Sequence, residues 1–132
     1  MKLEIFGKQL EEHSGLSAHI ERRLRFALGR FGARVARVET TLTDLNGPRG
    51  GVDKQCRIIA SLVPKGEVIV EVRDADIFIA VDRAADRLGR VTARELERRR
   101  EQAIRPFEVG RISAAALFRR QPRTRREEGG IG

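Results

Sequence analysis

The chain has 132 residues, a formal net charge of +8 and a pI near 11.1. The length predicts one domain with a modest core, and the charge favours polyanionic partners, most simply nucleic acid. A single cysteine excludes an internal disulfide and fits a reducing cytoplasm. The first residues lack the apolar run of a signal peptide, and no stretch approaches the roughly 18 apolar residues of a membrane span. We therefore expect a soluble, cytoplasmic protein with no membrane contact.

The first half of the predicted fold is a strand over residues 2–6, a helix over residues 17–31 and a strand over residues 35–45. Ser17 suits an N-cap and Gly32 a helix stop. Apolar residues recur at helical spacing along the helix and at every second position along the strand, as expected for one buried face on each. The helix stripe comprises Ile20, Leu24, Ala27, Leu28 and Phe31.

The second half begins with a turn-rich loop over residues 46–54, followed by strands over residues 55–63 and 68–72. Pro64, Lys65 and Gly66 predict the hairpin turn between them. A long helix then runs from Asp74, a good N-cap, to about Gln102. Its apolar stripe comprises Ile77, Val81, Ala84, Ala85, Leu88 and Val91.

This order, β-α-β-β-β-α, predicts an α+β fold of two layers, with a four-stranded sheet covered on one face by two helices. We expect the folded domain to span residues 1–104. A weak helical turn or two at residues 112–118 would lie in a basic, largely disordered tail, residues 105–132.

The long helix has arginines along one flank of its polar side, at positions 83, 87, 90, 94 and 98. Spacings of three and four residues place these like charges together, which weakens an isolated helix and suits a bound polyanion. Arginines of both helices, namely Arg22, Arg23, Arg83, Arg87, Arg90 and Arg94, would share one basic surface for phosphates. The alternative is a solvated face on which Asp82, Asp86 and Glu97 are the partners, with Asp86 pairing to Arg90 and to Arg83.

Arginine outnumbers lysine, which suits RNA because a guanidinium forks onto phosphate and stacks on bases. A genome rich in arginine codons would give the same bias. With six phenylalanines and no tyrosine or tryptophan, a base-stacking platform like that of single-strand binders is not expected. Binding should depend on RNA shape and backbone.

The loop over residues 46–54 contains a Gly-Pro-Arg-Gly run but joins two strands, so it fits neither the helix-joining GxxG loop of KH domains nor a P-loop. It is interpreted as a turn that needs glycine. The alternative is that Arg49 and Lys54 contact phosphate at the edge of the main site.

No catalytic or metal-binding constellation is found. His13 and His19 are six positions apart and do not share a helical face, so His19 is interpreted as a satisfied surface histidine. Cys56, on an apolar strand face, is interpreted as a buried, inert thiol. Asp74 and Asp76 are explained by helix capping. We expect neither enzymatic activity nor a cofactor, a metal or a small-molecule substrate.

The sequence resembles the ribosome hibernation promoting factors, also called ribosome-associated inhibitor A or sigma-factor modulation proteins. The resemblance covers about residues 1–103 and rests on Gly7-Lys8-Gln9, on residues 18–24 (AHIERRL), on the loop 46–54 (NGPRGGVDK) and on residues 74–88 (DADIFIAVDRAADRL). The chain is too short for the ribosome-pairing domain of long members, and its tail is basic where some short members end in acidic residues. It therefore resembles a short form of the family.

The resemblance implies a fold similar to double-stranded-RNA-binding domains. It also implies binding to the small ribosomal subunit, where family members occupy the mRNA and tRNA positions in stress or stationary phase. Lys8, Arg23, Arg87, Arg90 and Arg94 match rRNA-contacting positions, and Arg22 and Arg83 extend that set by geometry. We expect a monomer when free. Two alternatives are a general double-stranded-RNA binder and a protein-interaction regulator of transcription. Whether the protein pairs ribosomes or silences single ones stays open.

Overall fold

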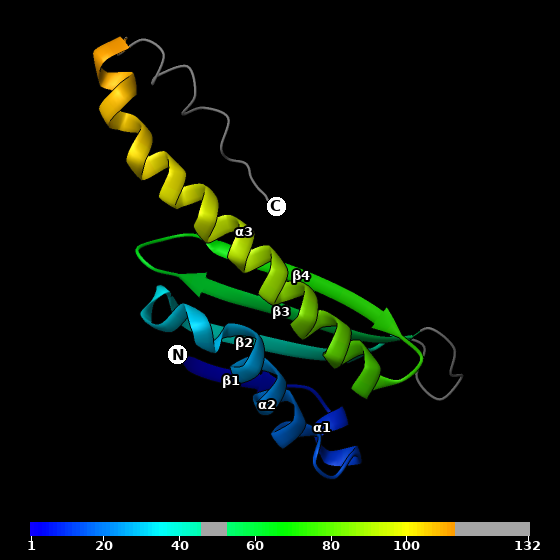
Figure 1. The fold of residues 1–132 in the computed structure, drawn as a ribbon. Helices are drawn as coiled ribbons and strands as arrows, with labels where there is room; N and C mark the ends of the chain where they lie inside the picture. Colours follow the sequence, from blue (N-terminus) through cyan, green and yellow to red (C-terminus); the bar gives the residue numbers. More distant parts are fainter. Residues whose placement is uncertain (46–52, 113–132) are drawn as a thin grey trace. The chain divides into compact units, whose positions relative to one another are not determined.

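The structure is a computed structural model that describes the backbone of residues 1–45 and 53–112 and the side chains of residues 1–45 and 53–102. The chain forms two compact units, Met1–Val91 and Thr92–Gly132. The helices and strands, shown in Figure 1, are β1 (Lys2–Phe6), α1 (Gln9–Glu12), α2 (Leu16–Leu28), the 3-10 helix η1 (Gly29–Arg34), β2 (Val35–Asp44), β3 (Lys54–Leu62), β4 (Glu67–Asp74) and α3 (Ile77–Ile112).

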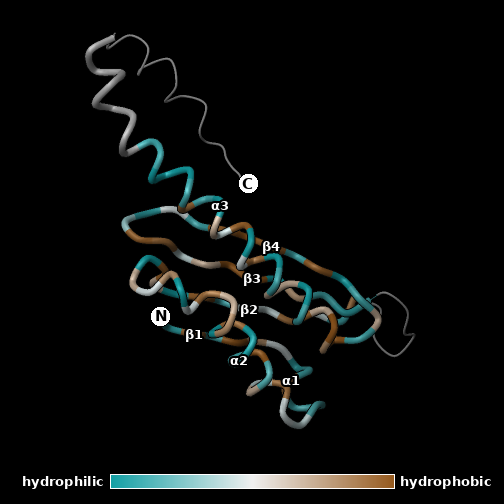
Figure 2. Tube along the Cα trace, viewed as in Figure 1, coloured by the Kyte–Doolittle hydropathy of each residue, from teal (hydrophilic) through white to brown (hydrophobic). Residues whose placement is uncertain are grey.

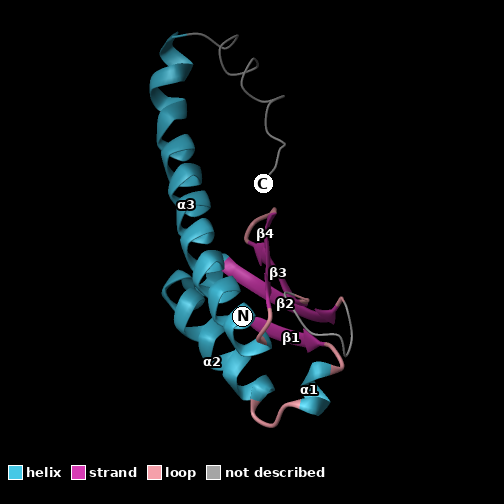
Figure 3. Ribbon diagram, turned by 90° about the vertical axis from the view of Figure 1, so that its right-hand side faces the viewer, coloured by secondary structure: helices cyan, strands magenta, loops and turns pink. Residues whose placement is uncertain are grey.

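The four strands form one sheet in the order β1-β2-β3-β4. β1 and β2 are parallel because α2 lies between them in the chain, and the two later pairings are antiparallel. In the first unit, α2 and the beginning of α3 cover one face of this sheet, as Figure 3 shows from the side. The predicted α+β fold, with its four-stranded sheet and helices on one face, is therefore confirmed.

The core lies between the sheet and the two helices. Every second strand residue faces it, and in the register Thr40 pairs with Ile58, which pairs with Val70. Figure 2 shows the hydrophobic positions recurring along the strands. The predicted helix stripes are buried at most positions, whereas Ala27, Phe31 and Val91 are half-buried. The buried apolar side chains of α2 and α3 in this unit are Leu16, Ile20, Leu24, Leu28, Ile77, Ala80, Val81, Ala84, Ala85 and Leu88.

The first long helix, α2, begins and ends at different residues from those predicted. α2 begins at Leu16 after Gly15, whose φ of 83° lies in the left-handed region that favours glycine, so Ser17 is inside the helix and is not its N-cap. After Leu28 the backbone continues as η1, and Gly32 interrupts it with a φ of 56°. The short helix α1 was not predicted, because four residues are too few to show a helical period.

The second helix begins later and ends later than predicted. Asp74 ends β4, and Asp76 is the cap: its Oδ1 accepts hydrogen bonds from the amides of Phe78 at 2.8 Å and Ile79 at 3.4 Å. α3 continues past Gln102 and through Pro106 to Ile112. A proline inside a helix destabilises it by about 3 kcal/mol without necessarily ending it. The turns predicted after residue 112 lie outside the described residues.

Cys56 confirms the interpretation of a buried, inert thiol. It lies on the inward face of β3 and is 0% exposed. Burial raises the pKa of its thiol from the ordinary 9.0 to about 12, because the thiolate would lose its hydration. The thiolate that a nucleophile needs is therefore scarce near neutral pH.

This pKa predicts a loss of stability in alkali. Below pH 9 the thiol is protonated in both the folded and the unfolded protein, but between about 9 and about 12 only the unfolded thiol ionises, so the free energy of unfolding falls as pH rises. Urea denaturation at pH 8 to 10.5 should show a steeper decline for the parent than for Cys56→Ala, which lacks the thiol. Parallel declines would contradict the raised pKa.

α2 and α3 approach closely where Gly89 of α3 meets Ala27 of α2. A Cβ added at Gly89 would lie 3.2 Å from the carbonyl oxygen of Ala27 and 3.4 Å from its Cβ. The first of these contacts is with backbone, which cannot rotate away. Glycine at this position therefore lets the two helices pack at this distance without a shift of the backbone.

Gly89→Leu should therefore lower the free energy of unfolding by about 1–3 kcal/mol, because the added side chain overpacks the contact between the helices. Gly29→Ala is the matched control: its backbone is helical, with a φ of −57°, and an added Cβ would meet nothing within 4 Å. The control should raise stability by roughly 0.4–1 kcal/mol. Urea denaturation of the three proteins measures both effects, and a Gly89→Leu protein as stable as the parent would rule out the close approach.

Candidate nucleic-acid interface

The face of the sheet that is turned away from the helices carries balanced charge. Its ion pairs join Glu4 to Lys2 and to Arg37, and Arg57 to Glu71. The hydrogen bond from Arg37 lowers the pKa of the Glu4 carboxyl, which keeps the pair ionised. The charged side chains that alternate onto this face are Lys2, Arg37, Arg57 and Arg73 against Glu4, Glu39, Glu67 and Glu71. A polyanion would gain little electrostatic free energy by binding to this face of the sheet.

α2 and α3 meet along a seam, here defined as His19, Arg23 and Ala27 of α2 with Asp82 and Gly89 of α3. Asp82 Oδ1 lies 2.6 Å from His19 Nε2 and 3.3 Å from Arg23 Nε. The arginine contact is an ion pair without hydrogen-bond geometry. The three α2 residues recur every four positions, so one flank of α2 faces α3 along its length.

His19 is satisfied, as predicted, but it is half-buried rather than on the surface. Its ring also lies against Phe78, with the ring centroids 5.3 Å apart, while His13 meets the same phenylalanine edge-on at 5.8 Å. The side chain of His19 is 22% exposed. The two histidines therefore pack around the first turn of α3, and the part of the chain with described side chains holds no group of three residues suited to a metal ion.

Arg23, a predicted RNA contact, belongs to this seam through its ion pair with Asp82. Its side chain keeps 37% exposure. Arg22, one position along, is exposed and has no ion pair with any residue whose side chain is described. Consecutive helix residues point about 100° apart, which separates their environments. Of the two predicted α2 contacts, Arg22 is the one free to bind phosphate.

The α3 arginines of the first unit point away from the seam and are exposed. Arg83 Nη1 lies 3.2 Å from Asp74 Oδ2, and Arg90 pairs with Asp86 one turn earlier. The amide of Asp76, and after it Arg83, lowers the pKa of Asp74. The predicted pair of Asp86 and Arg90 is therefore found, whereas Arg83 pairs with the end of β4 rather than with Asp86.

Arg87 differs from its neighbours on α3, because it is exposed and pairs with no carboxylate among the described side chains. Asp82 faces α2, and Asp86, four residues later, lies on the same side of the helix. These two carboxylates therefore lie between the arginines of α2 and those of α3. The predicted basic surface is divided into two parts rather than continuous.

The second unit contains Arg94, which is exposed and has no ion pair with a described side chain. The arginines that follow it among the described side chains are paired: Arg98 and Arg99 hydrogen-bond to Glu95 at 2.8 and 2.9 Å. Burial alone would raise the pKa of Glu95, but the two arginines outweigh it, and the pKa is lowered. Glu97 lies 3.8 Å from Arg100. Among residues 92–102, Arg94 is thus an arginine available to bind an anion.

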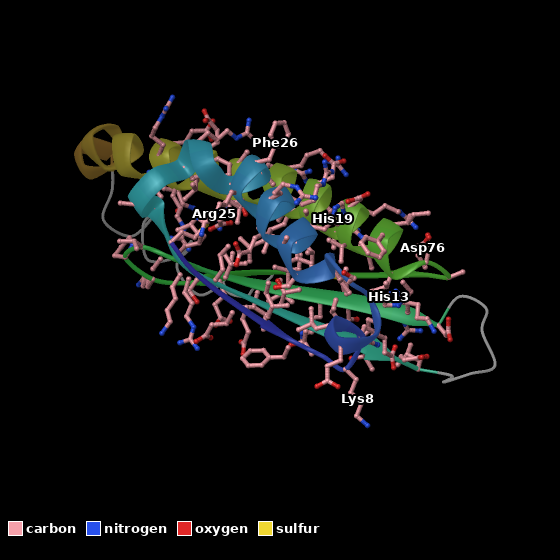
Figure 4. All side chains as sticks on the ribbon, turned by 90° about the horizontal axis from the view of Figure 1, so that it is seen from below. Lys8, His13, His19, Arg25, Phe26 and Asp76 are labelled. Atoms are coloured by element: carbon pink, nitrogen blue, oxygen red, sulfur yellow. The ribbon has the colours of Figure 1, made fainter. Side chains whose placement is uncertain are left out.

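Lys8 lies apart from the helix arginines. It precedes α1 and is exposed. Figure 4 shows its side chain pointing to the opposite side from Phe26 of α2. The structure therefore does not bring Lys8 together with the outward-facing arginines.

Lys54 is half-buried and held by two carboxylates. Its Nζ lies 3.0 Å from Asp44 Oδ2 and 3.2 Å from Asp53 Oδ2, and the hydrogen bond to Asp44 is the main cause of its raised pKa. Arg49 and the other residues at positions 46–52 of the predicted glycine loop lie outside the described residues. The pairing of Lys54 favours the structural interpretation of its role over a phosphate contact.

No helix among the described residues is long and apolar enough to cross a membrane.

The solved structures with this fold include the N-terminal domain of Thermus thermophilus protein Y, with 28% identity, a TM-score of 0.57, and 71% of this chain and 98% of that chain covered. A ribosomal subunit interface protein from Coxiella burnetii has 14% identity, a TM-score of 0.58 and coverage of 74% and 99%. At that lower identity the likeness concerns the fold alone.

No protein of curated function matches the chain in sequence. A family model, described as sigma 54 modulation protein / S30EA ribosomal protein, matches residues 3–100. The match includes α2, all of the sheet except Lys2, and the α3 arginines up to Arg100. The chain therefore belongs to the sigma 54 modulation protein / S30EA ribosomal protein family.

Proposed function

We propose that this protein is a ribosome-associated translation inhibitor that binds the small ribosomal subunit through its helices. Its body would block the mRNA and tRNA sites by occupancy, under stress or in stationary phase. The observation that carries the proposal is the charge asymmetry: the open face of the sheet is balanced, while Arg22 and Arg87 stand exposed and unpaired among the described side chains of the helices. The family's description as a ribosomal protein supports rRNA as the polyanion.

The unpaired arginines should supply most of the binding free energy. Each phosphate contact releases counterions, which favours binding. An unpaired guanidinium forms this contact without first breaking an ion pair with a carboxylate. Arg83 and Arg90 must exchange Asp74 and Asp86 for phosphate, which offsets part of the gain. Arg22, Arg87 and Arg94 are therefore the principal contacts of this proposal.

The proposal also includes the remaining expectations about this protein. The protein needs neither catalysis nor a cofactor, acts in the cytoplasm and is monomeric when free. Residues 1–104 form the ribosome-binding domain and residues 105–132 a basic tail. The similarity to double-stranded-RNA-binding domains and the contacts of Lys8, Arg23, Arg49 and Lys54 with RNA stay predictions.

Reversing the charges of Arg87, Arg90 and Arg94 to glutamate should abolish cosedimentation with small subunits. None of the three faces the core, so circular dichroism should show an intact fold. The matched control reverses three arginines that lie on the charge-balanced face of the sheet, Arg37, Arg57 and Arg73. The control should still bind, and a folded α3 variant that still cosediments would overturn the proposed surface.

Single substitutions should separate unpaired from paired arginines. Arg87→Ala should weaken binding to small subunits more than Arg90→Ala, because Arg90 has to give up its pair with Asp86 to contact phosphate and therefore contributes less. Titration across a salt series should show a slope reduced by roughly one for Arg87→Ala. Equal effects of the two substitutions would contradict the distinction.

The family's description also names sigma 54 modulation, which favours a regulatory protein-interaction module as a second candidate function. Such a module would bind an acidic protein and ignore RNA. Cosedimentation with small subunits at low salt, with duplex RNA as competitor, separates the possibilities. Competition by duplex RNA would indicate a general RNA binder, and no binding at low salt would favour the protein partner.

A further inference from the structure

Phe26 is 84% exposed, more than any other large hydrophobic residue of the described chain, of which the next is Ile69 at 51%. It lies within α2, so regular backbone holds it in place. Figure 4 shows its ring pointing away from the sheet, on the outer side of the helix layer. Leaving so much aromatic surface in water forgoes the free energy that its burial would contribute.

The surroundings of Phe26 are cationic. Its neighbours three and four positions away in the chain are Arg22 and Arg23 of α2 and Gly29 and Arg30 of η1, with no acidic residue among these four. A Cβ added at Gly29, three residues after Phe26, would meet nothing within 4 Å. The guanidinium of Arg30 lies over the ring of Phe31, 4.8 Å from its centroid.

We propose that Phe26 is a stacking site for an unpaired nucleobase of the bound RNA; this rests on the proposed function and adds a specific contact to it. An aromatic ring beside arginines offers a base a flat surface and its phosphate a cation, the combination that single-stranded RNA needs. An apolar protein partner would require a contiguous apolar patch, and here the neighbours are charged. A second copy of the chain would bring like charges together.

The proposal agrees with the scarcity of aromatic residues, because one ring on α2 is an anchor for a single base rather than a platform for several. The phosphate contacts of the arginines set most of the affinity, and the stacked base fixes the position of the protein along the RNA. Phe26 and Arg22 lie on successive turns of α2, so the same helix supplies both kinds of contact.

The test measures the dissociation constant of small subunits with the full-length protein and with its Phe26→Ala, Phe26→Leu and Phe26→Trp variants at one salt concentration. Loss of the ring should weaken binding roughly ten-fold in both the alanine and the leucine variants. Tryptophan should bind at least as tightly as the parent. The salt dependence of Phe26→Ala should match that of the parent, because no charge is removed. The control Ile79→Ala, at an exposed residue of α3, should bind like the parent.

The outcomes separate the two proposals. A parent protein that does not bind small subunits overturns the proposed function, and with it this inference. A parent that binds, with Phe26→Ala equal to it, overturns the stacking site and leaves the function standing. Parent-like binding by Phe26→Leu would mean an apolar pocket of a ribosomal protein and would overturn stacking on a base.

A spectroscopic readout is available because the sequence contains no tryptophan. 5-Hydroxytryptophan incorporated at a Phe26→Trp codon can be excited to the red of the tryptophans of ribosomal proteins. Stacking on a base should quench its emission when small subunits are added, and the same label in an Ile79→Trp variant should be quenched less. Equal emission changes at the two positions would overturn the proposal.

Discussion

The seam between α2 and α3 determines how this protein presents its charge. The close approach of Gly89 to the backbone of Ala27 fixes the distance between the helices, and the shared carboxylate of Asp82 links His19 and Arg23 across them. One flank of each helix contacts the other helix, and another flank is buried on the sheet. Only the outward sides of the two helices are therefore exposed to solvent. The directions of Arg22, Arg87 and Phe26 follow from that constraint.

Pairing, more than position, distinguishes the arginines of the helices. Arg83 and Arg90 have carboxylate partners that relieve their mutual repulsion and stabilise the folded helix. Arg87 lies between them without one among the described side chains, so its repulsion remains until an anion binds. The folded domain thus gives up a little stability at Arg87, which a phosphate would restore in the proposed complex with RNA.

The sequence predicted the structure best where a single hydrophobic period dominates a segment. Alternation along β2, β3 and β4 predicted the buried faces correctly, and the helical stripes predicted the core of α2 and α3. Local backbone features were missed: Gly15 starts α2 through a left-handed conformation, and η1 replaces its predicted last turn. The seam was also missed, because a contact between His19 and Asp82 depends on how two distant helices pack and leaves no periodic signal in either.

The exposed ring of Phe26 weakens the argument that a chain with few aromatic residues cannot stack on RNA bases. Six phenylalanines and no other aromatic residue argue against a stacking platform only if all six are treated alike. Burial separates them: Phe78 packs against two histidines at the beginning of α3, whereas Phe26 is exposed beside Arg22 and Arg23 of the same helix. A basic helix with one such ring combines phosphate contacts, which act on any RNA backbone, with a single contact that needs an unpaired base. That combination would favour structured rRNA with exposed bases over a uniform duplex.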